Sequence, residues 1–346
     1  MSDFVQTLIT ALAIGSLYAL IALGYTMVYG ILKFINFAHS DIVVLGAWSS
    51  YTLAVRILPW LRLDPHNPET VPPIWVAAVV MLAAMVFCGV VGFAIERLAY
   101  RRLRRAPRLN VLITAIGVSL LLQNVGQLDQ PLDRVWGLRH LASFLHVPIG
   151  HLHLGFGADP QKMPALLPSW ELASITFGEG ESARRIVIGL IDVVIFSLST
   201  TLMLMMQYLV FHTKLGVAMR AVSFNTDTAA LMGIPVDRVV SFTFVLGSVL
   251  AAAAGFLYVT KYPSMNQPAH AVWVLLGLKA FVAAVIGGIG NVRGAVLGGF
   301  VIAFVEQFGA FYISSNYRDV YVFALLIVIL LVKPSGLLGS PVREKV

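Results

Sequence analysis

Polar residues interrupt the first long apolar run of the chain, between Gly30 and Trp48. The residues there that are able to do chemistry are Asn36, His39, Ser40 and Asp41. Such side chains are costly near hydrocarbon, so they usually face the interior of a helix bundle or a water-filled path. Two interpretations stay open. The stretch is either a short cytosolic turn anchored by Lys33, or a helix broken at membrane depth whose free backbone groups line a pathway.

A second interruption lies near the C-terminus, where glycines divide an apolar run that is too long for one membrane crossing. The run extends from Trp273 to Tyr312, and its break contains Gly287, Gly288, Gly290 and Asn291. Breaks at corresponding places in two halves of a chain are the best sequence indication of a transport pathway. We therefore predict that both breaks contribute to one pathway, within a possible inverted repeat. Close helix packing through small residues fits the glycines equally well.

Two further ionisable residues, Lys279 and Glu306, lie inside apolar runs. They either line a pathway or neutralise one another across neighbouring spans, and the sequence does not decide between these. Together with Asp41, they also allow a rival function, that of an ion-coupled secondary transporter or channel.

The composition indicates an all-α, polytopic membrane protein with a single transmembrane domain over residues 1–346. Of the 346 residues, 58% are hydrophobic and 12% are charged, whereas roughly a quarter are charged in soluble domains. Apolar runs of about 20 residues match the thickness of a bilayer. They predict eight to ten transmembrane segments, with two interrupted helices. The one cysteine, Cys88, allows no disulfide framework.

The predicted spans are continuous apolar runs separated by polar or proline-rich segments. They cover Phe4–Tyr29, Ile42–Leu58, Ile74–Ile95, Leu109–Leu128, Ile186–Val210, Val239–Val259, two helices within Trp273–Tyr312, and Val320–Val332.

The net charge of +7 is concentrated in six arginines between Arg97 and Arg108, beside one span end. This position is typical of the cytosolic side of a membrane protein, with anionic lipid as a second partner, and it argues against nucleic-acid binding. Counting crossings from this cluster puts residues 211–238, Arg293 and the C-terminus in the cytosol. The same count puts the N-terminus outside, in the periplasm of a bacterial cell.

The segment from Asp129 to Arg185 is predicted to be an extended periplasmic loop that forms a small lid or docking surface. It contains four histidines, namely His140, His146, His151 and His153. A His-x-His pair can bind a metal. No cysteine or carboxylate accompanies the pair at ligand spacing, so the sequence favours an ordinary surface loop, and we predict no metal site.

The cytosolic loop at 211–238 is predicted to carry a short capped helix at Asp227–Met232. Asn225 or Thr226 suits its N-terminal cap, Gly233 suits its end, and Pro235 prevents its continuation. Apolar residues at helical spacing precede this helix and continue into it: Val217, Ala221, Phe224 and Leu231. Such a surface helix would dock a cytosolic partner or lie on lipid headgroups.

No P-loop, H-E-x-x-H or G-x-S-x-G motif occurs in the sequence. We therefore predict a protein that is not an enzyme, has no catalytic residues and needs no cofactor. Any ATP would be bound and hydrolysed by partner subunits.

Six stretches of the sequence together resemble the LivH-type permease subunits of branched-chain amino acid ABC importers. They are ALIALGYTMVYGILKFINFAHSD, IERLAYRRLR, LITAIGVSLLLQN, GVAMRAVSFNTDTAALMGIPVDRV, KAFVAAVIGGIGNVRGAVLGG and FALLIVILLVKPSGLLG. Ser40 departs from the family, which usually has glycine there, and we expect this to alter the bend. The segment from Asp129 to Arg185 is poorly matched.

The resemblance implies an inner-membrane permease with a second, LivM-like permease, two cytosolic ATPase subunits and a periplasmic substrate-binding protein. It also implies that the cytosolic loop contacts an ATPase, through Gly216, Arg220, Ala221, Asp227, Leu231, Gly233 and Ile234. Related permeases carry urea, amides or other amino acids, so these stay as alternative substrates.

Overall fold

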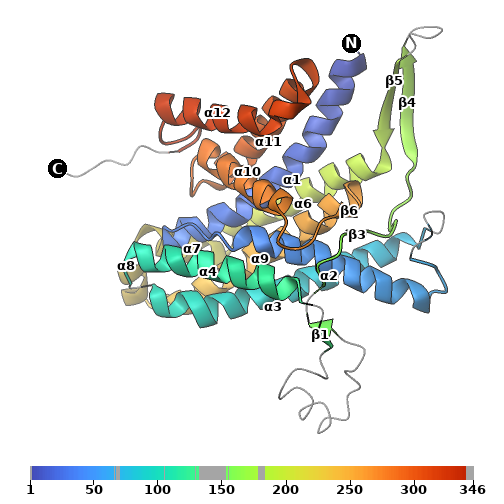
Figure 1. Ribbon diagram of the computed structural model, residues 1–346. Helices are drawn as coiled ribbons and strands as arrows, with labels where there is room; N and C mark the ends of the chain where they lie inside the picture. Colours follow the sequence, from blue (N-terminus) through green and yellow to red (C-terminus); the bar gives the residue numbers. More distant parts are fainter. Residues whose placement is uncertain are drawn as a thin grey trace.

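A computed structural model describes residues 2–65, 67, 71–104, 106–128, 130–131, 153–154, 156–177 and 184–339 (Figure 1). Eight helices in these ranges are long and apolar enough to cross a membrane. One further apolar helix, α10, has 17 residues. The helices are α1 (Ser2–Leu32), α2 (His39–Trp60), α3 (Ile74–Ile95), α4 (Arg108–Gly126), α6 (Leu190–His212), α9 (Val236–Lys261), α10 (Ala271–Gly287), α11 (Val292–Tyr312) and α12 (Arg318–Val332). The prediction of a polytopic helical membrane protein is confirmed.

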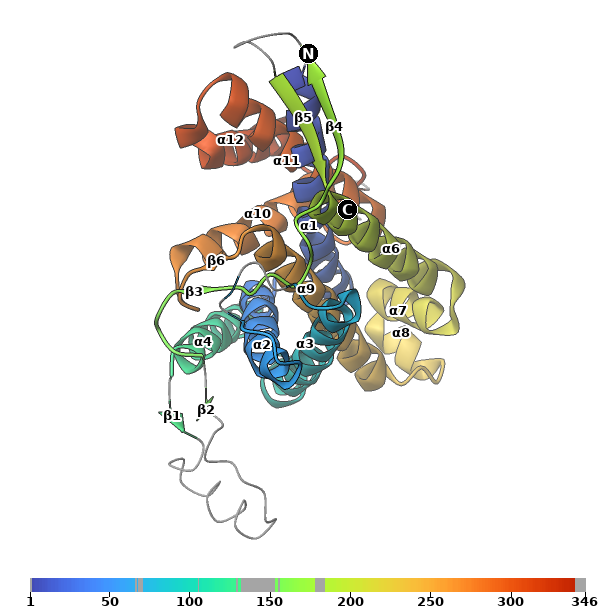
Figure 2. The same cartoon turned by 90° about the vertical axis from the view of Figure 1, so that its right-hand side faces the viewer.

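Helix α1 is at the centre of the bundle. From Ala13 to Val28 every residue is buried, so other helices, and not lipid, surround this apolar helix. It packs against α11, α9, α6 and α10. Figure 2 shows α1 between the α10 side and the α6 side of the molecule.

Small residues let the central helices approach closely. A Cβ atom added to Gly299 of α11 would lie 2.5 Å from the backbone nitrogen of Ala19 in α1. A Cβ atom on Gly46 of α2 would lie 2.5 Å from the Cα atom of Ala252 in α9. The small residues between Ala251 and Gly255 thus allow tight packing, because close backbone approach supplies dispersion contacts between helices in a membrane.

Both predicted breaks are present. The first is shorter than the polar stretch suggested: α1 ends at Leu32, Lys33 has a φ of +56°, and α2 begins at His39. The side chains of His39 and Asp41 therefore project from the first turn of a helix. The second break separates α10 from α11, with φ values of +107° at Gly288 and +91° at Gly290.

Three two-stranded antiparallel sheets lie outside the helical bundle. β1 (Gln130–Pro131) pairs with β2 (His153–Leu154), β3 (Gln161–Lys162) with β6 (Ser264–Met265), and β4 (Glu171–Phe177) with β5 (Arg184–Gly189). The hairpin β4–β5 lies beside the N-terminal part of α1 (Figure 1). There the backbone N–H of Val187 donates to Gln6 Oε1 at 2.9 Å.

The predicted start of the fifth span at Ile186 was wrong. Residues Arg184–Gly189 form strand β5, and the helix begins at Leu190. The β-branched run Ile186-Val187-Ile188 favours a strand, and β4 supplies the backbone partners. The lid function predicted for the segment from Asp129 to Arg185 stays a prediction. His140, His146 and His151 in this segment lie outside the described residues.

Residues 211–238 contain two short helices, and their apolar residues do not form one continuous stripe. They are α7 (Lys214–Phe224) and α8 (Thr226–Leu231). Asn225 separates them with extended backbone angles, so the predicted continuation of the spacing from Phe224 to Leu231 was wrong. The end of α3 continues as a π turn, Glu96–Tyr100, and a 3-10 turn, Arg101–Leu103.

Candidate functional site

The polar residues of the first break are buried inside the chain. The exposed fraction is 2% for Asn36, 1% for His39 and 4% for Asp41, whereas Ser40 is half-buried. A simple exposed turn does not account for this burial. Each of these groups needs a partner from another helix, because an unpaired polar group is costly in a low-dielectric interior.

Asn36 is held by a tyrosine that the sequence did not single out. The hydroxyl of Tyr100 donates to Asn36 Oδ1 at 2.7 Å. The Tyr100 ring packs against Phe34 and Phe244, at centroid distances of 5.3 and 5.4 Å. The π turn at the end of α3 therefore ties the first break to α9.

Asp41 is only partly satisfied. Gln123 of α4 donates from Nε2 to Asp41 Oδ1 at 2.9 Å and also contacts Ser119 Oγ at 3.3 Å. The second carboxylate oxygen, Oδ2, has no hydrogen-bond partner among the described residues. A buried carboxylate with one amide donor is expensive to keep. The buried position of Asp41 therefore indicates a functional role. In the sequence, Gln123 stands out as a glutamine inside an apolar span, and this was the available signal for the partner of Asp41.

His39 and Ser40 sit where glycines make room for them. A Cβ atom on Gly24 of α1 would lie 2.3 Å from His39 Nε2, and a Cβ atom on Gly277 of α10 would lie 2.1 Å from Ser40 Cβ. The His39 ring meets the Tyr25 ring edge-on at 4.5 Å. The first turn of α2 is thus wedged between α1 and α10.

A cavity of about 240 Å³ lies beside this turn, between α2, α4 and α10. Its polar wall consists of Ser40, Ser119 and Gln123, and its aromatic wall of Tyr25, Phe37 and Phe281. The remaining lining residues are apolar and face outward: Ile116, Leu120, Val274 and Leu278. Such a cavity suits a small molecule that has one apolar part and one polar end.

The second break contacts the first through Gly290 and not through Asn291. A Cβ atom on Gly290 would lie 3.8 Å from the Cα atom of Gly30, at the end of α1. Asn291 instead caps α11, accepting from the N–H groups of Arg293 and Gly294 at 3.0 and 3.2 Å. Its Nδ2 atom donates to the Leu338 carbonyl at 2.7 Å.

The segment after α12 covers the remaining glycines of this break. The N–H groups of Leu337 and Leu338 donate to the carbonyls of Ile286 and Gly287 at 2.7 and 3.0 Å. A Cβ atom on Gly288 would lie 2.6 Å from the backbone nitrogen of Gly339. These contacts explain Gly287 and Gly288 as close-packing residues.

Lys279 and Glu306 pair with one another. Lys279 Nζ lies 3.0 Å from Glu306 Oε1 and 2.7 Å from Asp319 Oδ1. The Tyr18 hydroxyl donates to Glu306 Oε2 at 2.8 Å. The two alternatives left open by the sequence are resolved in favour of pairing, since each buried charge has an opposite charge within contact distance. The network joins α1, α10, α11 and α12.

The two short helices of the loop at 211–238 are both capped. Thr213 Oγ1 accepts from the Gly216 N–H at 3.1 Å, and Asn225 Oδ1 accepts from the Thr228 N–H at 2.9 Å. Gly233 ends α8 with a φ of +80°, as expected for a residue without a Cβ penalty. Asp227 lies exposed in the first turn, and Ile234 is half-buried beyond the end.

Three large apolar side chains of this loop are exposed: 94% for Phe224, 87% for Leu231 and 78% for Met232. Single exposed apolar residues are ordinary, whereas a group of them indicates an interaction surface. We call Phe224, Leu231 and Met232 the apolar tip.

Gly216, Arg220 and Ala221 connect the loop to the bundle. A Cβ atom on Gly216 would lie 2.2 Å from the Val210 carbonyl oxygen. Arg220 Nη1 donates to that carbonyl at 2.6 Å, and Ala221 packs half-buried against the core. The Phe211 ring lies between the guanidinium groups of Arg220 and Arg293, at 5.5 and 5.2 Å.

Ser223 of α7 reaches the first break directly. Its hydroxyl donates to the carbonyl oxygen of Gly30 at 2.6 Å. The carbonyls in the last turn of a helix lack partners within that helix, so this bond stabilises the end of α1. The sequence analysis did not identify Ser223, which has no distinguishing local pattern.

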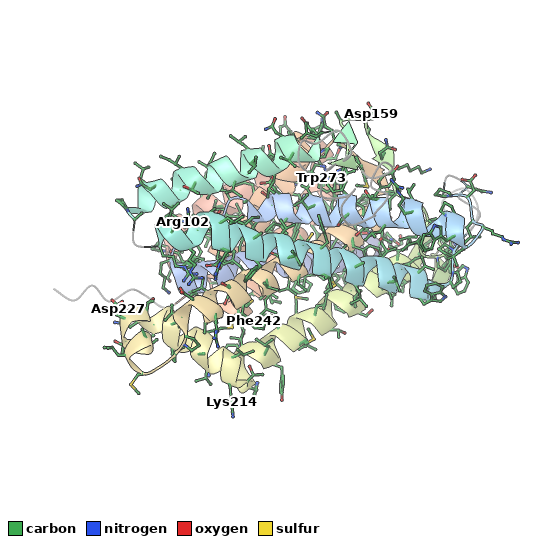
Figure 3. All side chains as sticks on the ribbon, turned by 90° about the horizontal axis from the view of Figure 1, so that it is seen from below. Arg102, Asp159, Lys214, Asp227, Phe242 and Trp273 are labelled. Atoms are coloured by element: carbon green, nitrogen blue, oxygen red, sulfur yellow. The ribbon has the colours of Figure 1, made fainter. Side chains whose placement is uncertain are left out.

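The arginine cluster and the loop at 211–238 lie at the same end of the helices. Figure 3 shows Arg102 and Asp227 at one end and Asp159 towards the other. Asp237, at the start of α9, pairs with Arg101 and with Arg104, the latter at 2.7 Å. Glu96 pairs with Arg104 and accepts from Ser241. Within the described ranges, no group of three or more histidine, cysteine or acidic side chains is placed to hold a metal.

Comparisons with known proteins agree on one family. The family model described as "Branched-chain amino acid transport system / permease component" matches residues 7–330. The high-affinity branched-chain amino acid transport system permease protein BraD of Pseudomonas aeruginosa is 36% identical over 99% of this chain and 98% of its own. The LivH protein of Escherichia coli K12, with the same description, is 35% identical over 99% and 98%.

One solved structure, "PsaBC from Streptococcus pneumoniae in complex with Fab", superposes on 95% of this chain and 92% of its own. The TM-score is 0.43 and the sequence identity 10%, a similarity too distant to carry any argument about this chain.

Proposed function

This chain belongs to the family of branched-chain amino acid transport system permease components, and on that premise we propose that it is a transmembrane subunit of an ATP-driven importer of branched-chain amino acids. The observation that carries the proposal is the match over residues 7–330, with relatives aligned along 98% of their length. The chain itself would perform no covalent chemistry.

The proposed assembly is in the inner membrane of a bacterial cell. It contains this chain, a second LivM-like permease, two cytosolic ATPase subunits and a periplasmic binding protein. The shared position of Arg102 and Asp227 (Figure 3) supports a cytosolic location for both. With nine crossings, the N-terminus would lie in the periplasm and the C-terminus in the cytosol.

The proposed pathway runs along the cavity beside the first turn of α2. Ser40, Ser119 and Gln123 would contact the polar end of an amino acid, and the rings of Tyr25 and Phe281 would contact its apolar side chain. The exposed apolar residues on α4 and α10 suit a second permease that closes the other side. Asp41, behind Gln123, would set the charge felt by a substrate ammonium group.

The proposed coupling element is the apolar tip with α7 and α8. An ATPase that bound the tip would move a loop that is already joined to the bundle through Gly216, Arg220 and Ser223. Because Ser223 contacts Gly30, and Gly30 lies against Gly290, displacement of this loop would reach both breaks.

The test is uptake of labelled leucine into vesicles that contain this chain with its candidate partners. The proposal expects uptake only when ATP, the ATPases and the binding protein are all present. Uptake driven by an ion gradient without the ATPases would instead support an ion-coupled transporter based on Asp41, Lys279 and Glu306. A preference for urea, amides or other amino acids over leucine would change the substrate class but leave the importer intact.

A further inference from the structure

An open groove of about 1060 Å³ lies between the end of α3, the turn after α8 and the start of α9, away from the cavity described above. Three arginines border it, Arg97, Arg101 and Arg238, and its apolar wall includes Phe93, Phe242 and Val245. In Figure 3, Phe242 lies between the helix ends that carry Arg102 and Lys214.

The groove has an excess of positive charge. Arg101 and Arg104 are paired with Asp237, and Arg104 also with Glu96. Arg97 and Arg238 are exposed, and neither has an ion-pair partner among the residues that the structure describes. Three guanidinium groups and one carboxylate, that of Asp237, thus line the groove, which leaves two positive charges for an outside anion.

The apolar part of the groove continues onto a surface that faces hydrocarbon. Phe93 is 45% exposed, and it lies in a helix that is long and apolar enough to cross a membrane. Val90, one turn deeper, is also exposed. Arginines at the end of the helix, with exposed apolar side chains one turn deeper, match the two parts of a phospholipid molecule.

We propose that this groove binds one anionic phospholipid, with its phosphate between Arg97 and Arg238 and its acyl chains over Phe93 and Phe242. Gly233 and Ile234 of the proposed coupling loop border the groove, but its apolar wall extends into the membrane-spanning part of α3, which a soluble ATPase does not reach. The charge on the groove distinguishes an anionic lipid from a zwitterionic one. The proposed lipid site depends on α3 spanning the membrane, and it does not depend on which substrate is transported.

The test compares lipid retention by the full chain, purified with its partner subunits, using native mass spectrometry. The probes are phosphatidylglycerol, phosphatidylcholine and inorganic phosphate. The wild-type protein should retain one phosphatidylglycerol in preference to phosphatidylcholine. An arginine near a membrane surface contributes about fivefold to the affinity for anionic lipid, so the double variant Arg97→Gln/Arg238→Gln should retain it roughly 30-fold more weakly.

Arg102→Gln is the matched control, because Arg102 belongs to the same cluster but does not line the groove. It should retain phosphatidylglycerol like the wild type. Phe93→Gln leaves the charge unchanged and should weaken retention of lipid but not of inorganic phosphate.

Four results would overturn the proposal. Equal loss in Arg102→Gln and the double variant would indicate nonspecific charge. Displacement of lipid by millimolar inorganic phosphate would indicate a free-anion site. Lipid retained only after the ATPases have been removed would mean that a protein occupies the groove. Leucine uptake is measured in parallel, and normal uptake with no lipid retention would reject this site alone.

Discussion

The hydroxyl of Ser223 donates a 2.6 Å hydrogen bond to the carbonyl oxygen of Gly30. These residues are 193 positions apart in the chain. The bond joins α7, in the proposed coupling loop, to the end of α1, where the first break begins. It is a direct link between the proposed site of energy input and the broken helices.

Ser223→Ala should reduce transport while the ATPases stay bound. The substitution removes about 1 kcal/mol of hydrogen bonding and leaves a helix-end carbonyl without this donor. We expect ATP hydrolysis to continue with less leucine moved per ATP, measured in reconstituted vesicles. Ser197→Ala, which removes only a bond within α6, is the control. An unchanged ratio of transport to hydrolysis in Ser223→Ala would show that the bond has no role in coupling.

Leu231→Asp should weaken binding of the ATPases without unfolding the chain. Leu231 is 87% exposed, so a charge there costs little in the isolated subunit but much in an apolar contact. The measurement is co-purification of the ATPases, followed by substrate-stimulated hydrolysis. Wild-type values would mean that the apolar tip rests on lipid headgroups.

Gly233→Val should disturb the same element through backbone strain. The φ of +80° at Gly233 is unfavourable for a β-branched residue, and no atom lies within 4 Å of an added Cβ. A substitution at this position therefore introduces backbone strain without a steric clash. Gly233→Asn should be much milder, because asparagine tolerates a positive φ. Equal hydrolysis and transport in the valine and asparagine variants would contradict a role for this turn.

Gly290→Leu should block transport while the complex stays assembled. Its φ of +91° is unfavourable for leucine, so the substitution strains the backbone of the break, where an added Cβ would lie 3.8 Å from the Cα atom of Gly30. Gly288→Leu should also block transport, but by displacing the segment after α12 that contains Leu338 and Gly339. Gly117→Leu, where nothing lies within 4 Å, is the control. Normal uptake by Gly290→Leu would remove the second break from the pathway.

Asp41→Asn should lower leucine uptake without lowering stability. Asparagine keeps an oxygen for the Gln123 donor at 2.9 Å. It also removes the buried charge of Asp41, whose Oδ2 atom has no partner among the described side chains. The measurements are uptake and thermal unfolding of the same preparation. Normal uptake would mean that the buried charge serves no step of transport.

Cysteine labelling tests the orientation of the chain. The one native cysteine, Cys88, is buried, so single cysteines introduced at Arg102 and Arg220 report on their own positions. Both should resist an impermeant reagent added from outside, whereas His151→Cys should react. Outside labelling at position 220 would reverse the predicted topology.

Local features of this protein follow from its sequence. Apolar runs of membrane length specify the helices, since each backbone group must be paired within its own span in lipid. The second break and the cap of α8 are likewise set by neighbouring residues: glycines with positive φ, and Asn225 bonding to Thr228 three residues on. The resemblance to branched-chain amino acid permeases also rests on contiguous residues.

Only the tertiary structure decided which distant polar groups meet. Asp41 with Gln123, Asn36 with Tyr100, and Lys279 with Glu306 each depend on the rotation and depth of two separate helices. A span that is apolar on all sides carries little periodic signal about which side faces a neighbour. In β5, cross-strand bonding to β4 decided against helix. Helix packing through glycines fixes those rotations, and so it creates the site.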